Sequence, residues 1–228
     1  MKLTFRSKNE IVYEQLRTAI ISGEYKPGTR LVIDQLAADL GVSQIPIREA
    51  VKQLEADGFV TIEPYAGATI TEINASLIFE IFALLESLEV ICSRAACRQI
   101  DADELEALAE LVARMDADLS DPEKWSRDNK AFHLFIGECS KLALANGMLM
   151  NVLDHWDRLR FYYLKSVFGL RIKDAQDEHK QMAKAIEARN PDRVEALVRQ
   201  HNQNALASYI AYLRTEGELA PDSEDVYV

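Results

Sequence analysis

Three histidines in the C-terminal two thirds of the chain have a spacing that could support metal chemistry. His133 follows Asn129 by four residues, so a helix would present both side chains on one face. His179 and His201 lie 22 residues apart, each near the middle of its own predicted helix. Packed antiparallel, such helices could bring the imidazoles level, and three imidazoles with one oxygen ligand suit Zn²⁺, Mn²⁺ or Ni²⁺. Spacing alone leaves open that each histidine is an ordinary surface or core residue.

Two arginines on a neighbouring predicted helix could complete a ligand site. Arg158 or Arg160 could hold a carboxylate as a bidentate partner. They are two residues apart, about 200° around a helix, so only one is expected to face a pocket. Solvated surface arginines fit the pattern equally well, and His155, outside the spacing of the other histidines, is interpreted as structural or surface.

Helical periodicity is continuous after residue 74 and predicts an all-helical bundle, which can enclose a ligand pocket. Helix-capping and helix-starting residues mark the breaks: Asn74, Asp101, Asp121, Pro122, Asn190 and Pro191. The predicted helices span about 75–99, 102–119, 122–140, 144–168, 171–189 and 191–214.

The first 73 residues predict three short helices and a β-hairpin. The helices are expected over 9–22, 34–40 and from Ser43 to Gly58, and the hairpin over 59–72 with its turn at 64–67. Gly41 is expected to cap the second helix in the left-handed conformation. This order indicates a winged helix-turn-helix, whose third helix would enter the DNA major groove.

The apolar stripe of the third helix leaves an opposite polar face that could read DNA. Gln44, Arg48 and Lys52 are residue types that contact base edges or phosphates. Arg30 could add a phosphate contact, and Gly67 would let the wing backbone approach the DNA. The candidate DNA-binding residues are Arg30, Ser43, Gln44, Arg48, Lys52 and Gly67. A winged helix used only for protein contacts is the alternative.

A run of motif residues extends over about residues 10–72. It reads Gly23-x-x-x-Pro27-Gly28-x-x-Leu31, then Leu36-Ala37-x-x-Leu40-Gly41-Val42-Ser43-x-x-Pro46-x-Arg48-Glu49-Ala50-x-x-x-Leu54-x-x-x-Gly58. This segment resembles the GntR family of bacterial transcription regulators. The resemblance implies a dimer on a near-palindromic operator, with Arg48 as the helix arginine that the family retains. Family members usually have Arg where this chain has Gln44, so the operator sequence and affinity stay open.

A second set of motifs covers about residues 75–215: Phe132-His133, Glu178-His179-x-x-x-x-x-Ala185-Ile186 and Asp192-x-x-x-Ala196-x-x-x-x-His201. It is similar to the FCD effector domain of the FadR subfamily of GntR regulators. The resemblance implies a divalent metal, zinc before manganese or nickel, on His133, His179 and His201, with a small organic acid at or beside it.

The oxygen ligand of that pattern falls on Asn129, a neutral amide where many members have Asp, which predicts weaker metal binding. Asp128 should point elsewhere, because five residues place it about 140° from the His133 direction. Leu85 replaces the arginine that members often carry four residues before Glu89, so a different ligand, or a different binding mode, is expected.

The helix predicted at 75–99 carries more apolar residues than one core stripe needs: Leu77, Phe79, Ile81, Phe82, Leu84, Leu85, Leu88, Val90 and Ile91. Part of this surface could pack on a second copy. A helix buried on all sides within its own bundle is the alternative.

The composition bears on two questions, whether the chain can contact DNA and which cellular compartment it occupies. The 228 residues carry a net charge of −11, yet residues 1–73 hold 8 basic and 10 acidic residues, so the charge does not exclude a local DNA contact. Three cysteines do not form a disulfide framework, no signal peptide is recognisable, and no stretch is apolar enough to span a membrane, which favours the cytoplasm.

The sequence therefore predicts a mainly α protein with a winged helix-turn-helix at 1–73, an all-helical FCD effector-binding and dimerisation domain at 74–215, and a disordered acidic tail at 216–228. Its expected function is ligand-responsive transcription regulation as a homodimer, without enzymatic activity.

A metal-dependent enzyme acting on a small carboxylate is the alternative. No general base is marked beside the histidines and no nucleophile motif is present, which speaks against it. A helical dimerisation module that senses only metal is a third, weaker option.

Overall fold

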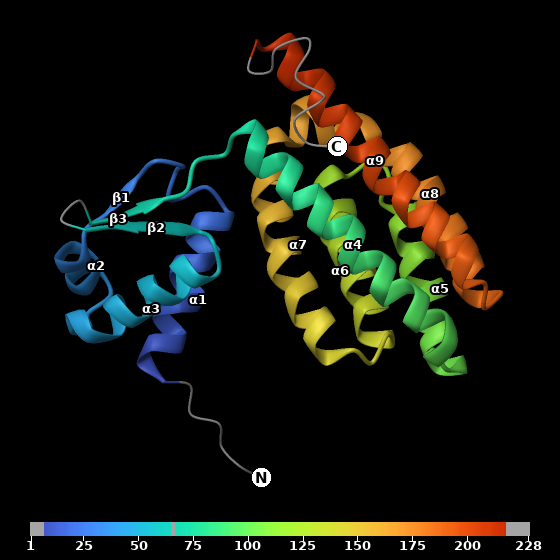
Figure 1. Ribbon diagram of the computed structural model, residues 1–228, viewed down its shortest axis with the longest axis horizontal. Helices are drawn as coiled ribbons and strands as arrows, with labels where there is room; N and C mark the ends of the chain where they lie inside the picture. The colour runs from blue at the N-terminus through green and yellow to red at the C-terminus, as the bar shows by residue number, and fades with distance from the viewer. Residues whose placement is uncertain (1–6, 65–66, 218–228) are drawn as a thin grey trace. The chain divides into compact units, whose positions relative to one another are not determined.

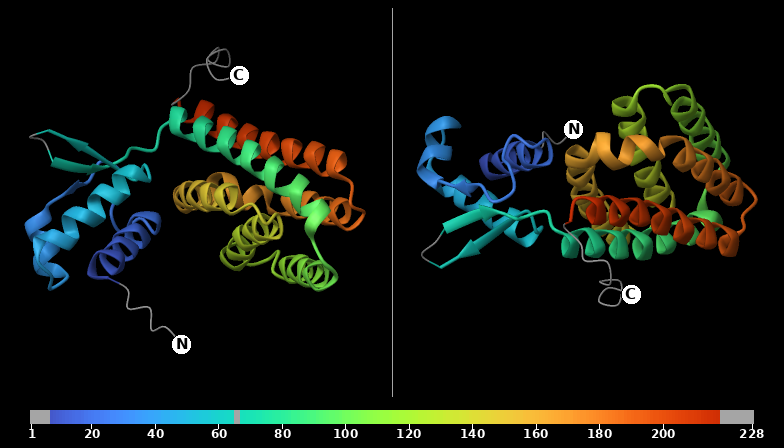
Figure 2. Two further views of the ribbon diagram at one scale, coloured as in Figure 1. Left: turned by 60° about the horizontal axis from the view of Figure 1, so that its bottom comes forward. Right: turned by 90° about the horizontal axis from the view of Figure 1, so that it is seen from above.

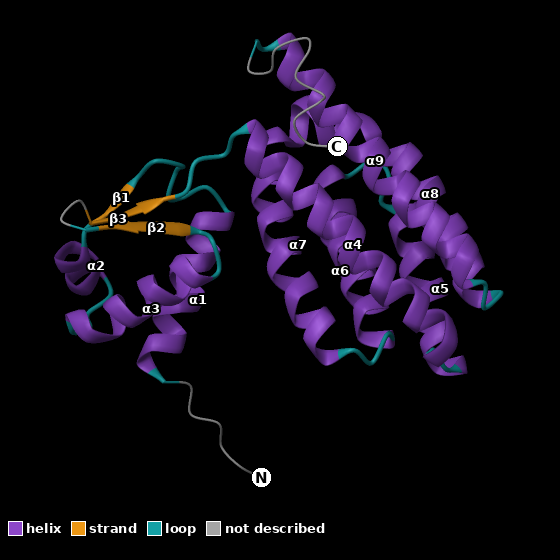
Figure 3. Cartoon of the chain, in the orientation of Figure 1, coloured by secondary structure: helices purple, strands orange, loops and turns teal. Residues whose placement is uncertain are grey.

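The computed structural model describes residues 7–64 and 67–217, and the chain divides into two units, Met1–Ile73 and Asn74–Val228 (Figure 1). The first unit combines helices with a small sheet, whereas the described part of the second is entirely helical (Figure 3). The predicted acidic tail lies outside the described residues, except for Glu216 and Gly217.

The first unit is a winged helix. Its elements are α1 (Lys8–Ile21), β1 (Arg30–Leu31), α2 (Ile33–Asp39), α3 (Gln44–Ala56), β2 (Val60–Glu63) and β3 (Gly67–Ile70). The sheet is antiparallel in the order β1-β3-β2, with Arg30 opposite Thr69 and Ile62 opposite Ala68. The predicted helices and the two strands of the hairpin are confirmed, whereas residues 65 and 66 of its predicted turn lie outside the described residues. The two-residue strand β1 was not expected, because so short a strand shows no alternation.

The turn between α2 and α3 follows from local chemistry. Gly41 has a φ of +64°, the left-handed conformation expected at the end of α2. Ser43 occupies the N-cap of α3, although its side chain makes no capping hydrogen bond. Ile47 and Leu54 anchor α3 in the core, where α1, α3 and the sheet meet.

The second unit is a bundle of α4 (Ala75–Gln99), α5 (Ala102–Ala117), α6 (Pro122–Cys139), α7 (Ala143–Tyr163), the π-helix η1 (Leu164–Phe168), α8 (Gly169–Glu187) and α9 (Pro191–Thr215). The side chains of Asn74, Asp101, Asp121 and Asn190 each accept the backbone N–H three residues on, so the predicted breaks are confirmed. The break expected after residue 168 is wrong, since η1 leads directly into α8.

Helices α4 and α9 lie side by side and form the most extensive helix pair of the bundle (Figure 2). Helix α4 buries Phe82 and Leu85 inward, whereas Leu84 and Ile91 are 43% and 49% exposed. The alternative of a helix buried on all sides within its own bundle is therefore wrong, because one side packs in the bundle and another is open. No helix within residues 7–64 and 67–217 combines the length and hydropathy that a bilayer crossing demands.

Candidate functional site

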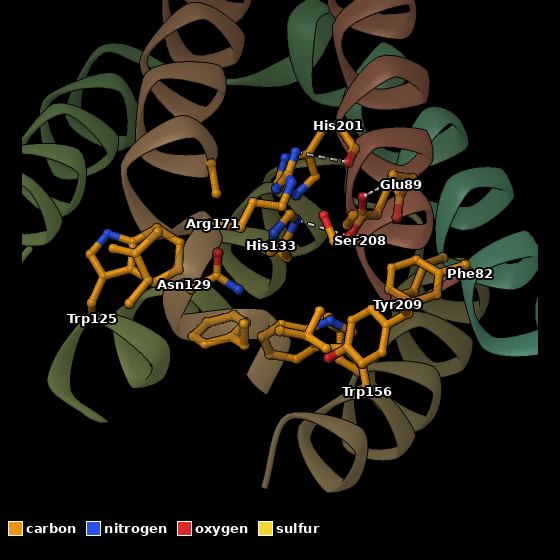
Figure 4. Close-up of a pocket in the computed structure, with 18 residues that line it drawn as sticks. Phe82, Glu89, Trp125, Asn129, His133, Trp156, Arg171, His201, Ser208 and Tyr209 are labelled. Carbon is orange, nitrogen blue, oxygen red and sulfur yellow. Dashed lines mark hydrogen bonds and ion pairs between the residues drawn. The ribbon is translucent and has the colours of Figure 1, made fainter. Parts of the chain in front are cut away.

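The three histidines predicted to act together come from α6, α8 and α9 and meet inside the bundle. Two of them, His133 and His201, are labelled in Figure 4. One ring nitrogen from each of His133, His179 and His201 lies within 4.8 Å of the others. Their ring centroids are 4.7–5.4 Å apart, and all three side chains are buried. One ion could therefore contact all three imidazoles.

Two carboxylates orient two of these imidazoles. Glu89 Oε1 lies 2.9 Å from His133 Nδ1, and Glu178 Oε2 lies 2.6 Å from His201 Nδ1. A neutral imidazole that donates from Nδ1 to a carboxylate keeps Nε2 as a lone-pair donor. This carboxylate–histidine arrangement is the one that commonly supports metal-bound imidazoles in proteins.

His179 differs from the other two because neither of its ring nitrogens has a hydrogen-bond partner among the described residues. Its side chain is fully buried, packed against the rings of Trp125 and Phe132. Burial lowers the pKa of His179 well below its ordinary value of 6.5, and the neighbouring His201 and His133 lower it further. His179 is therefore neutral, the form that binds metal.

Both carboxylates remain ionised. Burial opposes ionisation of Glu178, but its contacts with His201, Asn204 and Arg171 outweigh burial and lower the pKa to about 2. Burial likewise opposes ionisation of Glu89, and contacts with His133 and Asn202 lower its pKa below the ordinary value. The cluster is thus surrounded by two fixed negative charges, which favour a cation at its centre.

Asn129 is buried one turn before His133 on α6, and both side chains line a cavity beside the histidine cluster. Asp128, by contrast, points away from the cluster, as its position on the helix predicts. Its carboxylate forms an ion pair with Arg114 of α5, with Oδ2 2.8 Å from Nε. Of these two neighbours, Asn129 is the one placed to supply an oxygen ligand. His155 is buried and lies outside the cluster, as predicted.

The cavity beside the cluster is partly open to solvent. The expectation that Arg158 or Arg160 faces this cavity is not met, since neither lines it. Arg160 instead pairs with Asp157, one turn earlier on α7. The arginine that does line the cavity is Arg171 of α8, which pairs with Glu178.

Sequence reasoning missed Glu89, Glu178 and Arg171 as parts of the site. The sequence marked no general base beside the histidines, and the two carboxylates found there pair with Nδ1 of His133 and His201. A signal for Glu89 was present, because it interrupts the apolar side of α4 between Leu85 and Cys92. Glu178 directly precedes His179, and Arg171 lies about two turns before it on the same helix.

A second site candidate is the outer face of α3. Gln44, Arg48 and Lys52 are all exposed there, and Arg48 Nη2 donates to Gln44 Oε1 at 3.2 Å. Ser43 is exposed at the start of the helix. The face is therefore polar, open and carries two cations, as contact with DNA requires.

The other two DNA-binding candidates lie together on the sheet. Gly67 has a φ of +95°, and a Cβ placed on it would lie 3.3 Å from Arg30 Nε. The Arg30 guanidinium thus covers the start of β3, and a side chain at position 67 would be strained by the backbone and would press on that arginine.

A winged helix followed in the chain by a helical bundle with an internal cavity is the arrangement expected of a ligand-responsive DNA-binding regulator. Comparison with known families specifies the class further. Residues 8–70 match the family described as bacterial regulatory proteins, gntR family, and residues 80–204 match the FCD domain. The chain belongs to the GntR family of bacterial transcription regulators and carries an FCD domain, an arrangement consistent with the FadR subfamily.

The names of similar proteins agree with this family assignment. The chain is 28% identical over 194 residues to the uncharacterized HTH-type transcriptional regulator YdhC of Bacillus subtilis, covering 83% of this chain and 85% of YdhC. It is 28% identical over 198 residues to the HTH-type transcriptional repressor GlaR of Escherichia coli K12, covering 83% and 90%. These relatives are regulators, and the chain is a regulator and not an enzyme.

Solved structures share the fold. E. coli McbR/YncC superposes with a TM-score of 0.76 at 22% identity, covering 91% of this chain and all of that one. A GntR family regulator from Pseudomonas syringae pv. tomato gives a TM-score of 0.55 at 26% identity, covering 91% and 88%.

Proposed function

We propose that this chain is a homodimeric, ligand-responsive regulator whose helical unit binds a divalent metal and a small organic acid. Binding there changes the affinity of the winged helices for operator DNA in the cytoplasm. The observation that carries the metal proposal is His179, a neutral, fully buried imidazole with no hydrogen-bond partner among the described residues. A buried polar group without a partner is costly, and an ion ligated by His179 removes that cost.

The donor set fits a divalent ion, zinc most readily. His133, His179 and His201 would hold it through nitrogen, with Asn129 as the candidate oxygen ligand. Such an ion would supply positive charge to attract an organic acid. Residues of the chain do the rest, since Glu89 and Glu178 fix the imidazoles and Arg171 adds a cation at the cavity wall.

The direct test combines elemental analysis with a gel shift. Protein purified without chelator should contain about one divalent ion per chain. It should retard DNA from upstream of its own gene, and a panel of carboxylates should change that retardation. Protein that contains no metal and gains no melting temperature from Zn²⁺, Mn²⁺ or Ni²⁺ would contradict the metal proposal.

The proposed DNA-reading face predicts an effect of charge at position 44. Gln44→Arg adds a cation four residues from Arg48, and the two like charges repel each other on the helix face. If this face meets phosphates, non-specific affinity should rise, and the slope of log K against log salt should steepen by about one unit. Fluorescence anisotropy across a salt series measures this slope. The same substitution at exposed Gln53, on the far part of α3, is the control; an unchanged slope for Gln44→Arg would remove position 44 from the interface.

The open side of α4 is the proposed dimer surface. Leu77, Leu84, Leu88 and Ile91 are exposed or half-buried there, at the spacing of a helix seam. Helix-turn-helix regulators commonly bind two half-sites as dimers, which such a seam would provide.

The double variant Leu84→Glu/Ile91→Glu should therefore convert a dimer to a monomer, because it places charges in an apolar seam. Light scattering coupled to size exclusion measures the mass. Leu170→Glu, at an 81% exposed position of α8, is the matched control and should remain dimeric. A double variant that stays dimeric would place the interface elsewhere.

A further inference from the structure

Helices α4 and α9 run antiparallel along the cavity. The residues that they place at its two ends make one end polar and the other apolar. At one end Asn202 Nδ2 donates to Glu89 Oε2 at 2.7 Å, next to the histidine cluster. At the other end the rings of Phe82 and Tyr209 pack with centroids 5.4 Å apart. Seven residues separate the two ends on each helix, which is about 10 Å.

The far end has an apolar wall built from several helices. Figure 4 shows Phe82, Trp156 and Tyr209 grouped together, away from His201. The apolar side chains lining the cavity are Phe82, Leu85, Trp125, Leu153, Trp156, Val167, Phe168, Ile172, Ala175, Ala205 and Tyr209. The Tyr209 hydroxyl has no partner among the described residues, so this wall offers a ligand one polar group in a largely apolar lining.

The residues of α9 that line the cavity change from polar to apolar along the helix in the same direction. His201 lies at the polar end, Ala205 one turn on, and Tyr209 one turn further, all lining the cavity. Ala205, with its small side chain, lies between them. A ligand lying along α9 would thus pass from the imidazoles to an aromatic wall.

The fixed charges around the polar end favour a single negative charge on the ligand. Glu89 and Glu178 contribute two negative charges and Arg171 one positive charge, a balance of −1. With the divalent ion of the proposed function the balance is +1. One carboxylate would neutralise it, whereas a second carboxylate would leave an uncompensated charge against an apolar wall.

Arg171 has donors left for such a carboxylate. Its contacts with Glu178 and with the His201 carbonyl all use Nη2. Within the described part of the chain, Nε and Nη1 have no acceptor, and Arg171 lines the cavity. A guanidinium that keeps free donors beside an imidazole cluster suits an incoming carboxylate.

We propose, on the basis of the function proposed above, that the ligand is a monocarboxylate with an apolar body. Its carboxylate lies at the end formed by His133, His201 and Arg171, and its apolar body extends along α9 toward Phe82, Trp156 and Tyr209. This narrows the organic acid to one class and excludes sugar acids and di- or tricarboxylates as the preferred ligands.

The test is a chain-length series on full-length protein whose zinc content has been measured. Calorimetry with acetate, butyrate, hexanoate and octanoate should show affinity rising about fourfold per added CH₂, the value for burying a methylene. Octanol, which lacks the carboxylate, and suberate, which has a second one at the far end, should both bind at least tenfold more weakly than octanoate.

A matched pair of variants locates the apolar body. Ala205→Leu fills the middle of the cavity and should weaken octanoate at least tenfold while leaving acetate within twofold. Ala207→Leu makes the same change at an exposed position of α9 outside the cavity, and should leave the whole series unchanged.

The outcomes separate this inference from the proposed function. A flat chain-length series, or suberate, citrate or gluconate binding more tightly than octanoate, overturns the monocarboxylate inference and leaves a metal-dependent acid sensor in place. Zinc-loaded protein that binds none of these acids overturns both the inference and the organic-acid part of the function. Protein that holds no zinc but still shows the rising series contradicts the metal proposal and supports the apolar wall.

Discussion

His179→Leu should stabilise the metal-free protein and destabilise the metal-loaded protein relative to wild type. Without metal, His179 buries two ring nitrogens that have no hydrogen-bond partner among the described residues. An unsatisfied buried polar group costs about 1–3 kcal/mol, and leucine has none. Leucine can also pack against Phe132 and Trp125, which contact the imidazole now.

With metal bound, His179→Leu should lower the stability of the protein relative to wild type. An ion present at 1,000 times its dissociation constant stabilises the folded protein by about 4 kcal/mol, and the variant should lose most of this gain. In a chain of this size 1 kcal/mol corresponds to about 2–4 °C in melting temperature. Thermal melts with and without added Zn²⁺ therefore measure both effects.

Two controls make the comparison specific. His155→Leu removes a buried imidazole of α7 outside the cluster, so it should leave the metal-dependent gain in melting temperature intact. DNA binding by metal-free His179→Leu should persist, since the winged helix has a core of its own. If His179→Leu melts below wild type in chelator and gains as much from Zn²⁺, the imidazole is structural.

The sequence specified most of the architecture because local signals there are strong. Asn74, Asp101, Asp121 and Asn190 each form the capping hydrogen bond expected of them, and the helical period between them is unbroken. The continuity through η1 could not be foreseen. A π-turn changes the hydrogen-bond partner and leaves the polar and apolar pattern almost unaltered.

The histidine spacing predicted the cluster of His133, His179 and His201 that the structure contains. The rest of the site depends on tertiary packing. Glu89 interrupts the apolar side of α4, but it reaches His133 because α4 packs on α6, and the sequence of α4 does not name that partner. The choice between Arg158, Arg160 and Arg171 depends on how α7 and α8 rotate about their axes. A shift of one residue turns a helix by 100°, which periodicity cannot fix to that accuracy.

The DNA face makes the second large prediction, Arg48→Ala. Arg48 lies exposed between Gln44 and Lys52 on the outer side of α3, while Ile47 and Val51 hold the inner side in the core. Removing the guanidinium should weaken operator binding by about 1–3 kcal/mol, the range for a good base or phosphate contact.

The fold should not change, because the hydrogen bond that Arg48 makes among the described residues is the exposed one to Gln44. Circular dichroism and the melting temperature should therefore match wild type, and the metal content should be the same. Arg127→Ala removes the same charge from an exposed position of α6 and serves as the control for net charge.

Competition with unrelated DNA distinguishes the two roles that Arg48 could have. If it reads a base, the loss should be confined to the operator, and one base pair should lose its preference in a binding-site selection. If it holds a phosphate, operator and unrelated DNA should weaken together, with the salt slope reduced by about one unit. Wild-type affinity for both DNAs at moderate salt would mean that α3 is not the helix that reads the operator.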